Sequence, residues 1–358
     1  MESLTGTLKS RGLGLLAASG LLALPAISPA AAQNAGAAAD CRPEQGLTYI
    51  CGMVLPEDVV NVGSTGLVLA SGHRAPGHLY LIDPATAKVQ ELIQVPAFRQ
   101  RHDKRAYPSC PGPLNLMAFD THGLSIAETS PKHFVLYTTS HGEREAIEIY
   151  ELDLRGAAPV LTWTGCVPLQ QDGYFNAVAR LPDGGFVATR MRDTNVPTNA
   201  VAPGAISGRL FEWHPGGQLT PMAGTELSLP NGIETSQDGR YVFVAVTGTK
   251  ELLRLDRSVT PMARRAVTLP FGPDNVHLQA NGKLIIAGPN PPGPATCNGA
   301  PCPMGWTVVE MDPDTLAFSR VGGADGSVVL QRASAAIRVG NEIWVGSNQD
   351  RIARFTPK

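Results

Sequence analysis

The sequence lacks an excess of charge of either sign, and charged residues make up only 17% of its 358 positions. Lys and Arg number 29 and Asp and Glu number 31, so the net charge is -2. Because binding to nucleic acids or to anionic membranes depends on clustered basic residues, this balance argues against both kinds of partner. Hydrophobic residues make up 43%, so the chain can bury a large core and does not belong to the disordered class.

Long apolar runs are also missing. Beyond residue 32, no stretch approaches the roughly 18 continuous apolar residues of a membrane-spanning helix. At the start of the chain, Lys9 and Arg11 precede an apolar stretch over 13–27 that is broken by Gly, Ser and Pro, and Ala30–Ala32 follow it. This order is typical of a secretory signal peptide, whereas a membrane anchor would need a longer and unbroken run.

The pattern predicts a signal peptide over 1–32, an Ala-rich leader over 33–40 and a single domain over 41–358. We therefore expect a secreted protein of a bacterial periplasm, with no integral membrane segment once the signal is removed. Its expected partner is a small-molecule substrate.

The six cysteines all follow the predicted signal and leader, and an even number in an oxidising compartment favours disulfides. No C-x-x-C pair occurs, which argues against a zinc site. Cys297–Cys302 closes a Gly/Pro loop and is the best local pair. Cys41 with Cys51 and Cys110 with Cys166 would follow by proximity, although six cysteines allow many other pairings.

Pairs of short β-rich runs, separated by polar turns, recur six times along the chain. The runs are apolar or alternate with period two, and the 38 Gly and 30 Pro supply many turns between them. The six pairs are 66–70 with 78–83, 134–139 with 146–153, 185–189 with 208–213, 240–246 with 251–256, 283–287 with 306–312, and 342–346 with 351–355.

Six units of about 53 residues each predict an all-β fold, a six-bladed β-propeller of four-stranded antiparallel blades. A pair of β-sandwiches is the competing arrangement. Each unit begins with one further short strand, and in a propeller these first strands line the central channel. The predicted inner strands are 56–60, 121–126, 175–179, 230–234, 273–277 and 334–337.

Polar residues recur at the start of the predicted inner strands. A single Pro-Asn-Gly or Pro-Asp-Asn would be an ordinary turn, but recurrence at one position of successive repeats would bring the side chains together at the axis. Two carboxylates and three amides suit calcium, whereas zinc prefers nitrogen or sulfur and magnesium keeps more water. The candidate ligands are Glu57, Asn176, Asn231, Asp274 and Asn275.

Two histidines are expected at the same end of one blade. His122 opens an inner strand, and His141 follows the next strand of the same unit. Such a pair can act as a base and its orienting partner, because imidazole titrates near neutral pH. The alternative is two loop histidines without a role. His73 lies in a hairpin loop that could rim the mouth of the site, and 191–207 is a candidate lid.

These motifs resemble those of the paraoxonase family, calcium-dependent six-bladed propeller lactonases and arylesterases within the wider gluconolactonase/regucalcin-like group. The match rests on Glu57-Asp58, on His122 followed by His141, and on the segments 175–176, 230–233 and 273–275. The resemblance implies that the five oxygen ligands bind a catalytic calcium and that His122 acts as general base with assistance from His141. Glu57 or Asp274 could serve as the base instead.

The chain departs from the family pattern at two places that matter. The family's second, structural calcium uses an acid where this chain has Ala177, which argues against a second ion, although Asp58 and the Leu124 carbonyl remain as possible ligands. The family also joins an N-terminal Cys to one in the last strand, and no Cys follows Cys302 here.

The favoured hypothesis is an exported calcium-dependent hydrolase of lactones, aryl esters or both. Calcium would polarise the carbonyl, and a base would activate the attacking water. Two alternatives stay open. One is a sugar-lactonase of the gluconolactonase type, and the other is a non-catalytic propeller whose calcium only staples the blades while its surface binds a partner.

Overall fold

A computed structural model describes residues 41–290, 304–326, 329–330 and 332–357. The expected signal peptide (1–32), the leader (33–40) and the Cys297–Cys302 pair lie outside the described residues. All described residues belong to one compact unit.

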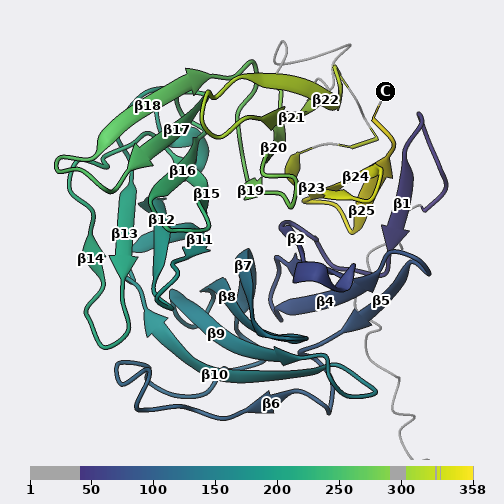
Figure 1. Cartoon of the computed structure of the whole chain (residues 1–358), viewed down its shortest axis with the longest axis vertical. Coiled ribbons are helices and arrows are strands. Elements are labelled where there is room, and N and C mark those ends of the chain that lie inside the picture. The colour runs from purple at the N-terminus through teal and green to yellow at the C-terminus, as the bar shows by residue number, and fades with distance from the viewer. Residues whose placement is uncertain (1–40, 291–303, 327–328, 331, 358) are drawn as a thin grey trace, which may run out of the picture. The chain divides into compact units, whose positions relative to one another are not determined.

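The described residues form a six-bladed β-propeller, as the repeats predict (Figure 1). The first blade contains β2 (Val59–Asn61), β3 (Val68–Gly72), β4 (His78–Asp83) and β5 (Lys88–Glu91). The second contains β7 (Asp120–Ser130), β8 (His133–His141), β9 (Ala146–Asp153), β10 (Val160–Pro168) and the short β6 (Arg99–Gln100). The third contains β11 (Gly173–Arg180), β12 (Phe186–Asp193), β13 (Arg209–Trp213) and β14 (Thr220–Pro221).

The fourth blade contains β15 (Pro230–Thr235), β16 (Tyr241–Val246), β17 (Glu251–Asp256) and β18 (Ala263–Thr268). The fifth contains β19 (Val276–Leu278), β20 (Leu284–Pro289), β21 (Trp306–Met311) and β22 (Phe318–Ala324). The sixth contains β23 (Ala333–Val339), β24 (Glu342–Ser347), β25 (Arg351–Phe355) and, as its outer strand, β1 (Thr48–Cys51).

The core lies between neighbouring blades, because each sheet buries both of its faces against the next sheet. Val60 and Leu69 of the first blade pack with Phe134 and Leu136 of the second in one apolar cluster. All four side chains are buried, which explains why their strands read as apolar runs in the sequence. The six inner strands β2, β7, β11, β15, β19 and β23 surround the centre of the ring (Figure 1).

The ring is closed by strand pairing between distant parts of the chain. β1 pairs antiparallel with β25, with Thr48 opposite Arg354 and Cys51 opposite Arg351. A disulfide between Cys41 and Cys51 ties the chain before β1 to the end of this strand. Backbone hydrogen bonds of this strand pair thus join the start of the described chain to its last strand.

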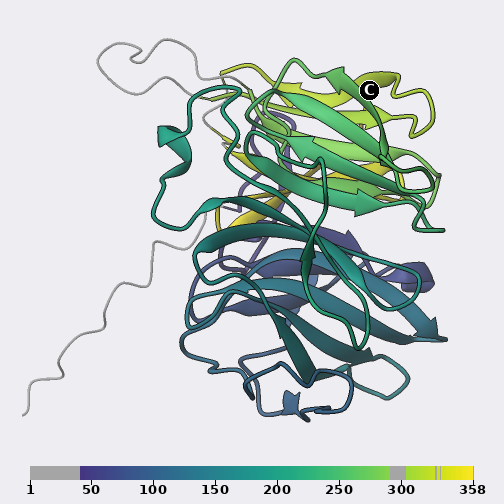
Figure 2. The same ribbon diagram turned by 90° about the vertical axis from the view of Figure 1, so that its left-hand side faces the viewer.

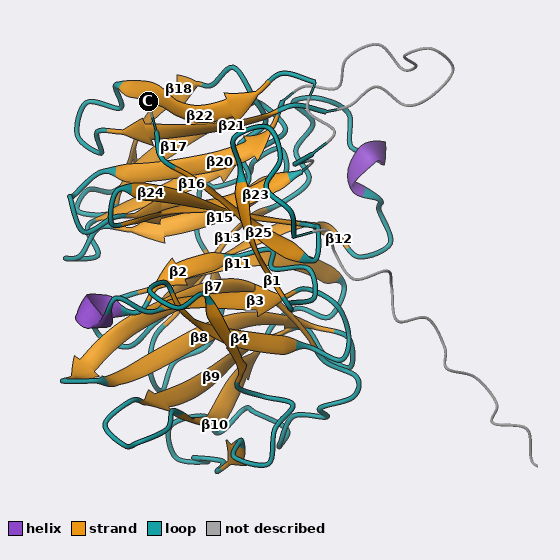
Figure 3. Ribbon diagram, turned by 90° about the vertical axis from the view of Figure 1, so that its right-hand side faces the viewer, coloured by secondary structure: helices purple, strands orange, loops and turns teal. Residues whose placement is uncertain are grey.

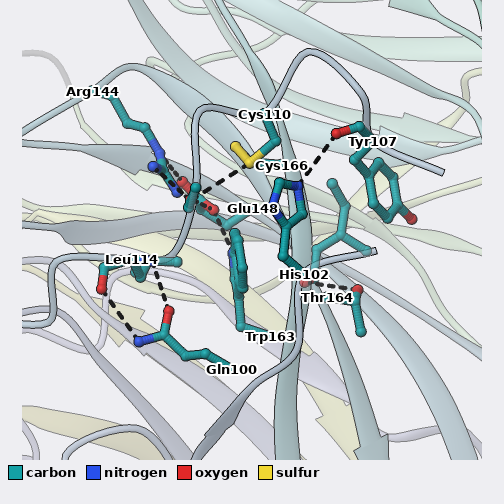
Figure 4. The surroundings of a disulfide bond; sticks show 12 residues. Gln100, His102, Tyr107, Cys110, Leu114, Arg144, Glu148, Trp163, Thr164 and Cys166 are labelled. Carbon is teal, nitrogen blue, oxygen red and sulfur yellow. Dashed lines mark hydrogen bonds and ion pairs between the residues drawn. A yellow bond between two sulfur atoms is a disulfide. The ribbon is translucent and has the colours of Figure 1, made fainter. Parts of the chain in front are cut away.

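The second blade has an additional strand, and a long loop is attached to the blade by a disulfide. β6 pairs parallel with β10, a feature that the four-stranded prediction did not include. Cys110 of the loop forms a disulfide with Cys166 of β10, the second of the proximity pairings predicted from the sequence (Figure 4). Beside it, the fully buried Glu148 accepts hydrogen bonds from Arg144 and from Trp163 (Figure 4).

Two short 3-10 turns complete the described secondary structure. They are η1 (Gly63–Thr65) and η2 (Thr198–Ala200), and they lie at opposite ends of the propeller (Figure 3). The loop that carries η2, between β12 and β13, projects beyond the ends of the blades (Figure 2). Among the described residues, no helix has the length and apolar character needed to cross a membrane.

The two disulfides are expected to contribute unequally to stability. Cys110 and Cys166 are 56 residues apart and Cys41 and Cys51 are 10 apart, so loop-closure entropy predicts a loss of about 4 kcal/mol for the first pair and about 3 kcal/mol for the second. Denaturant unfolding of the Cys110→Ala/Cys166→Ala and Cys41→Ala/Cys51→Ala variants measures both. A larger loss for the shorter loop would contradict this order.

Candidate metal and catalytic site

The inner strands of neighbouring blades come very close at the axis, and two glycines permit this. A Cβ on Gly123 of β7 would lie 2.7 Å from the backbone of β11. A Cβ on Gly232 of β15 would lie 2.5 Å from the Cα of Asn275, just before β19. These glycines directly follow His122 and Asn231, two of the predicted site residues.

Two carboxylates come together at this end of the axis. Glu57, just before β2, is 3% exposed, and its Oε1 accepts a 3.1 Å hydrogen bond from Nδ2 of Asn275. Burial, together with the charges of Asp274 and Asp58, raises the pKa of Glu57 well above its ordinary value. Burial also raises the pKa of Asp274 to about 7, while the Asn231 amide opposes this rise. A cation between the carboxylates would relieve both the desolvation and the repulsion.

The amide of Asn231 in β15 has a fixed orientation. Thr247 donates its hydroxyl proton to the carbonyl of Pro273 at 2.6 Å, so its Oγ1 is free to accept the 3.2 Å bond from Nδ2 of Asn231. The Oδ1 of Asn231 is therefore turned away from Thr247. Asn176 in β11 directs its Nδ2 toward Sδ of Met191 at 3.9 Å, which turns its Oδ1 in the other direction.

Three buried oxygens from three blades have no hydrogen-bond donor among the described residues: Glu57 Oε2, Asn176 Oδ1 and Asn231 Oδ1. Leaving a buried acceptor unsatisfied costs roughly 1–3 kcal/mol. Acceptors without donors beside two carboxylates fit a hard divalent cation such as calcium, which takes oxygen ligands in irregular geometry. In the described part of the chain, no three His, Cys, Asp or Glu side chains lie together in a way that could hold a metal ion. A metal site here would therefore need the amide oxygens of the Asn side chains as ligands.

Asp58, which the resemblance offered to a second ion, is engaged by donors of the protein itself. Its Oδ1 accepts from Nε2 of His277 at 2.7 Å, and its Oδ2 accepts from the backbone N–H of Leu124 at 2.7 Å. Burial disfavours a charged His277, but the charge and hydrogen bond of Asp58, aided by Glu234, outweigh it and raise the pKa of His277 to about 10. A buried imidazolium thus neutralises Asp58.

The two predicted histidines are in contact with each other, and one of them also lies near Glu57. β7 and β8 are antiparallel neighbours, and this brings Nδ1 of His122 to 2.9 Å from Nε2 of His141. The other ring nitrogen of His122, Nε2, lies 3.5 Å from Oε2 of Glu57. Both imidazoles are buried, at 4% and 7% exposure. His122 therefore links the candidate metal ligands to His141.

Glu145 completes this chain, and the sequence reasoning missed it. Its Oε1 lies 2.8 Å from Nδ1 of His141, and the residue is 8% exposed. A carboxylate only accepts, so the proton of His141 sits on Nδ1, and its Nε2 accepts the proton that His122 carries on Nδ1. Nε2 of His122 is then left as a free acceptor. The available signal was the spacing of four residues from His141, in a charged turn that resembles any solvated loop.

Two further aromatic side chains hold the histidine pair. His73, expected at the mouth, stacks on His122 with ring centroids 4.0 Å apart, and its Nδ1 lies 3.3 Å from Oδ1 of Asp120. Tyr174 in β11, which was not predicted, stacks on His141 at 4.4 Å. Burial, with the charges of nearby His73, His141 and Arg192, lowers the pKa of His122 well below its ordinary value, so this base is neutral at physiological pH.

Comparison with known protein families gives one match that spans more than half of the chain. Residues 73–293 match the family described as the SMP-30/Gluconolactonase/LRE-like region. The matched segment contains His122, His141 and four of the five candidate oxygen ligands, and Glu57 precedes it. No curated protein sequence matches the chain.

Several solved structures share the fold at low sequence identity. A luciferin-regenerating enzyme is 12% identical with a TM-score of 0.54, over 87% of this chain and 94% of that chain. A candidate gluconolactonase is 16% identical with a TM-score of 0.53, over 87% and 91%. A virginiamycin B lyase from Staphylococcus aureus is 13% identical with a TM-score of 0.50, over 87% and 99%. At these identities the likeness shows the propeller fold alone.

The Asp274→Asn variant is expected to stabilise the metal-free protein and to lose most of its stabilisation by calcium. The raised pKa of Asp274, about 7 against an ordinary 3.8, means that its ionisation weakens the fold as pH rises between these values. The increase in the free energy of unfolding that Asp274→Asn causes is therefore absent near pH 4 and complete above about pH 7, where it reaches on the order of 1–4 kcal/mol. Unfolding in EDTA and in excess calcium, across this pH range, measures both effects.

Asp325→Asn is the matched control, because this side chain is 82% exposed, and it should change neither quantity. The site would be wrongly placed if Asp274→Asn and the unaltered protein gained equal stability from calcium.

Proposed function

The chain belongs to the SMP-30/gluconolactonase/LRE-like family, and on this basis we propose that it is a calcium-dependent hydrolase of lactones. The observation that carries the proposal is the shared location of a base and a cation-binding group. The free Nε2 of His122 lies 3.5 Å from Oε2 of Glu57, which is one of the buried oxygens without a donor. Attack of water on a cyclic ester needs both groups at one place.

The residues that would hold the ion are Glu57, Asn176, Asn231, Asp274 and Asn275. When bound there, calcium supplies a positive charge that polarises the ester carbonyl and stabilises the oxyanion that develops on it. The role of the protein is to keep these oxygens in place and largely free of competing donors. The buried walls of the site also exclude bulk water, which strengthens every charge interaction within it.

The histidines would move the proton. His122 accepts a proton from the attacking water at Nε2, and its Nδ1–H remains bonded to Nε2 of His141. The positive charge that His122 gains is stabilised along this bond, because Nδ1 of His141 donates to the Glu145 carboxylate. Glu145 therefore fixes the tautomer of His141 and, through it, the free nitrogen of His122.

Aryl esters are a second proposed substrate class. The histidine pair beside the oxygen ligands is the feature that resembles the paraoxonases, and it favours this class over a purely sugar-lactone range. A panel of aliphatic lactones, sugar lactones and phenyl acetate separates the two. A non-catalytic, calcium-stapled propeller would hydrolyse none of them.

We also propose that the protein is exported. The disulfides Cys41–Cys51 and Cys110–Cys166 are of the kind that form in oxidising compartments, and the predicted signal peptide over 1–32 agrees with this location.

Hydrolysis is expected to depend on both calcium and His122. Chelation should abolish turnover and re-addition of calcium should restore it, while His122→Gln should lower kcat by about 100- to 10,000-fold, the usual contribution of a general base. Steady-state kinetics on the lactone panel measures this. If His122→Gln left kcat unchanged while chelation abolished it, the base would be Glu57 or Asp274 instead.

Glu145→Gln should lower kcat by about 10- to 100-fold with little change in KM, because the variant keeps the shape of the side chain but loses the charge that stabilises protonated His122 through His141. The pH profile of kcat should shift as well, which a purely structural role would not cause. Glu143→Gln, an exposed carboxylate of the same turn, is the control and should leave both quantities as they are. Equal rates for the two variants would exclude the positioning role.

A further inference from the structure

The ring of Tyr174 separates Arg192 in β12 from His141 of the histidine pair. It is directly opposite Tyr174 in the β11–β12 register, and its guanidinium carbon lies 4.1 Å from the centroid of the Tyr174 ring. His141 stacks on the same ring at 4.4 Å with an interplanar angle of 6°. Two groups this close to one ring must lie on its opposite faces, so the order is arginine, tyrosine, histidine.

The guanidinium of Arg192 is held in place by neutral acceptors. Its Nε donates to the hydroxyl of Thr198 at 3.0 Å, and its Nη1 donates to the carbonyl of Asp193 at 3.0 Å. Thr198 begins η2, in the loop that projects at this end of the propeller (Figure 2). Nη2 makes no hydrogen bond to any residue that the structure describes. The group is thus fixed in position and still has donors to offer.

The charge of Arg192 also lacks a carboxylate partner in the described part of the chain. Two acids of the same blade pair with a different arginine, since Oδ1 of Asp193 lies 2.5 Å and Oδ2 of Asp172 3.7 Å from Nη2 of Arg190. Arg192 is half-buried beside the site, where an uncompensated positive charge has an energetic cost unless a ligand provides the anion.

We propose that Arg192 is a specificity-determining residue that binds an anionic substituent of the substrate, so that the preferred substrates are lactones carrying a carboxylate at a distance from the ester. This inference rests on the proposed lactonase function. Arginine suits the task, because its planar fork binds a carboxylate through two parallel hydrogen bonds. The thickness of the Tyr174 ring separates the guanidinium from His141, so the anion must lie several bonds from the carbonyl that is attacked.

The test uses γ-lactones that carry a carboxylate one to three methylenes from the ring, each paired with its neutral carboxamide. The calcium-loaded protein should hydrolyse at least one carboxylate with about 10- to 100-fold higher kcat/KM than its carboxamide, the usual range for a hydrogen-bonded charge. Arg192→Gln should remove this preference through KM, so that each carboxylate and its carboxamide are hydrolysed with equal kcat/KM. Arg192→Lys should retain part of it. Arg209→Gln is the control, since Arg209 lies in the same blade and has Glu226 within 3.5 Å.

Equal rates on carboxylates and carboxamides, or an equal loss on both in Arg192→Gln, would overturn the inference while the lactonase function stands. If neither series is hydrolysed, the proposed function fails, and calorimetric binding of the same lactones decides the inference alone. Tighter binding of the carboxylates that depends on Arg192 would support it, and equal binding of the two series would overturn it.

Discussion

The structure depends on one constraint, the burial of acceptor oxygens at the propeller axis without donors to satisfy them. Glu57, Asn176 and Asn231 come from three different blades, and each keeps an oxygen without a hydrogen bond among the described residues. Such groups destabilise the fold unless a cation is bound. Gly123 and Gly232, which directly follow His122 and Asn231, allow neighbouring inner strands to approach closely, so the packing of these strands bears directly on the proposed metal site.

The same end of the axis separates two kinds of charge compensation. Asp58 is neutralised within the protein by the imidazolium of His277, whereas Glu57 and Asp274 have raised pKa values and no such partner. The protein therefore supplies its own cation to Asp58, whereas we propose that Glu57 and Asp274 bind an external one. The proposed base, His122, lies beside Glu57 and is connected to Glu145 through His141.

The sequence predicted those features that depend on local patterns and repetition. The period-two runs gave the six blades and all six inner strands, and the proximity of Cys41 to Cys51 and of Cys110 to Cys166 gave two disulfides. It did not predict the pairing of β1 with β25 or the parallel strand β6. Both pairings join segments that are far apart in the sequence, and no local residue pattern indicates which strand pairs with which. Glu145 and Tyr174 were missed for the same reason, since their roles arise from contacts with His141 that no spacing rule encodes.

The most direct test of the central claim is the anomalous diffraction signal of crystals grown with calcium. The account predicts one ion on the propeller axis, about 2.3–2.6 Å from Glu57 Oε2, Asn176 Oδ1 and Asn231 Oδ1. An axis that holds only water, or an ion bound away from these oxygens, would contradict it.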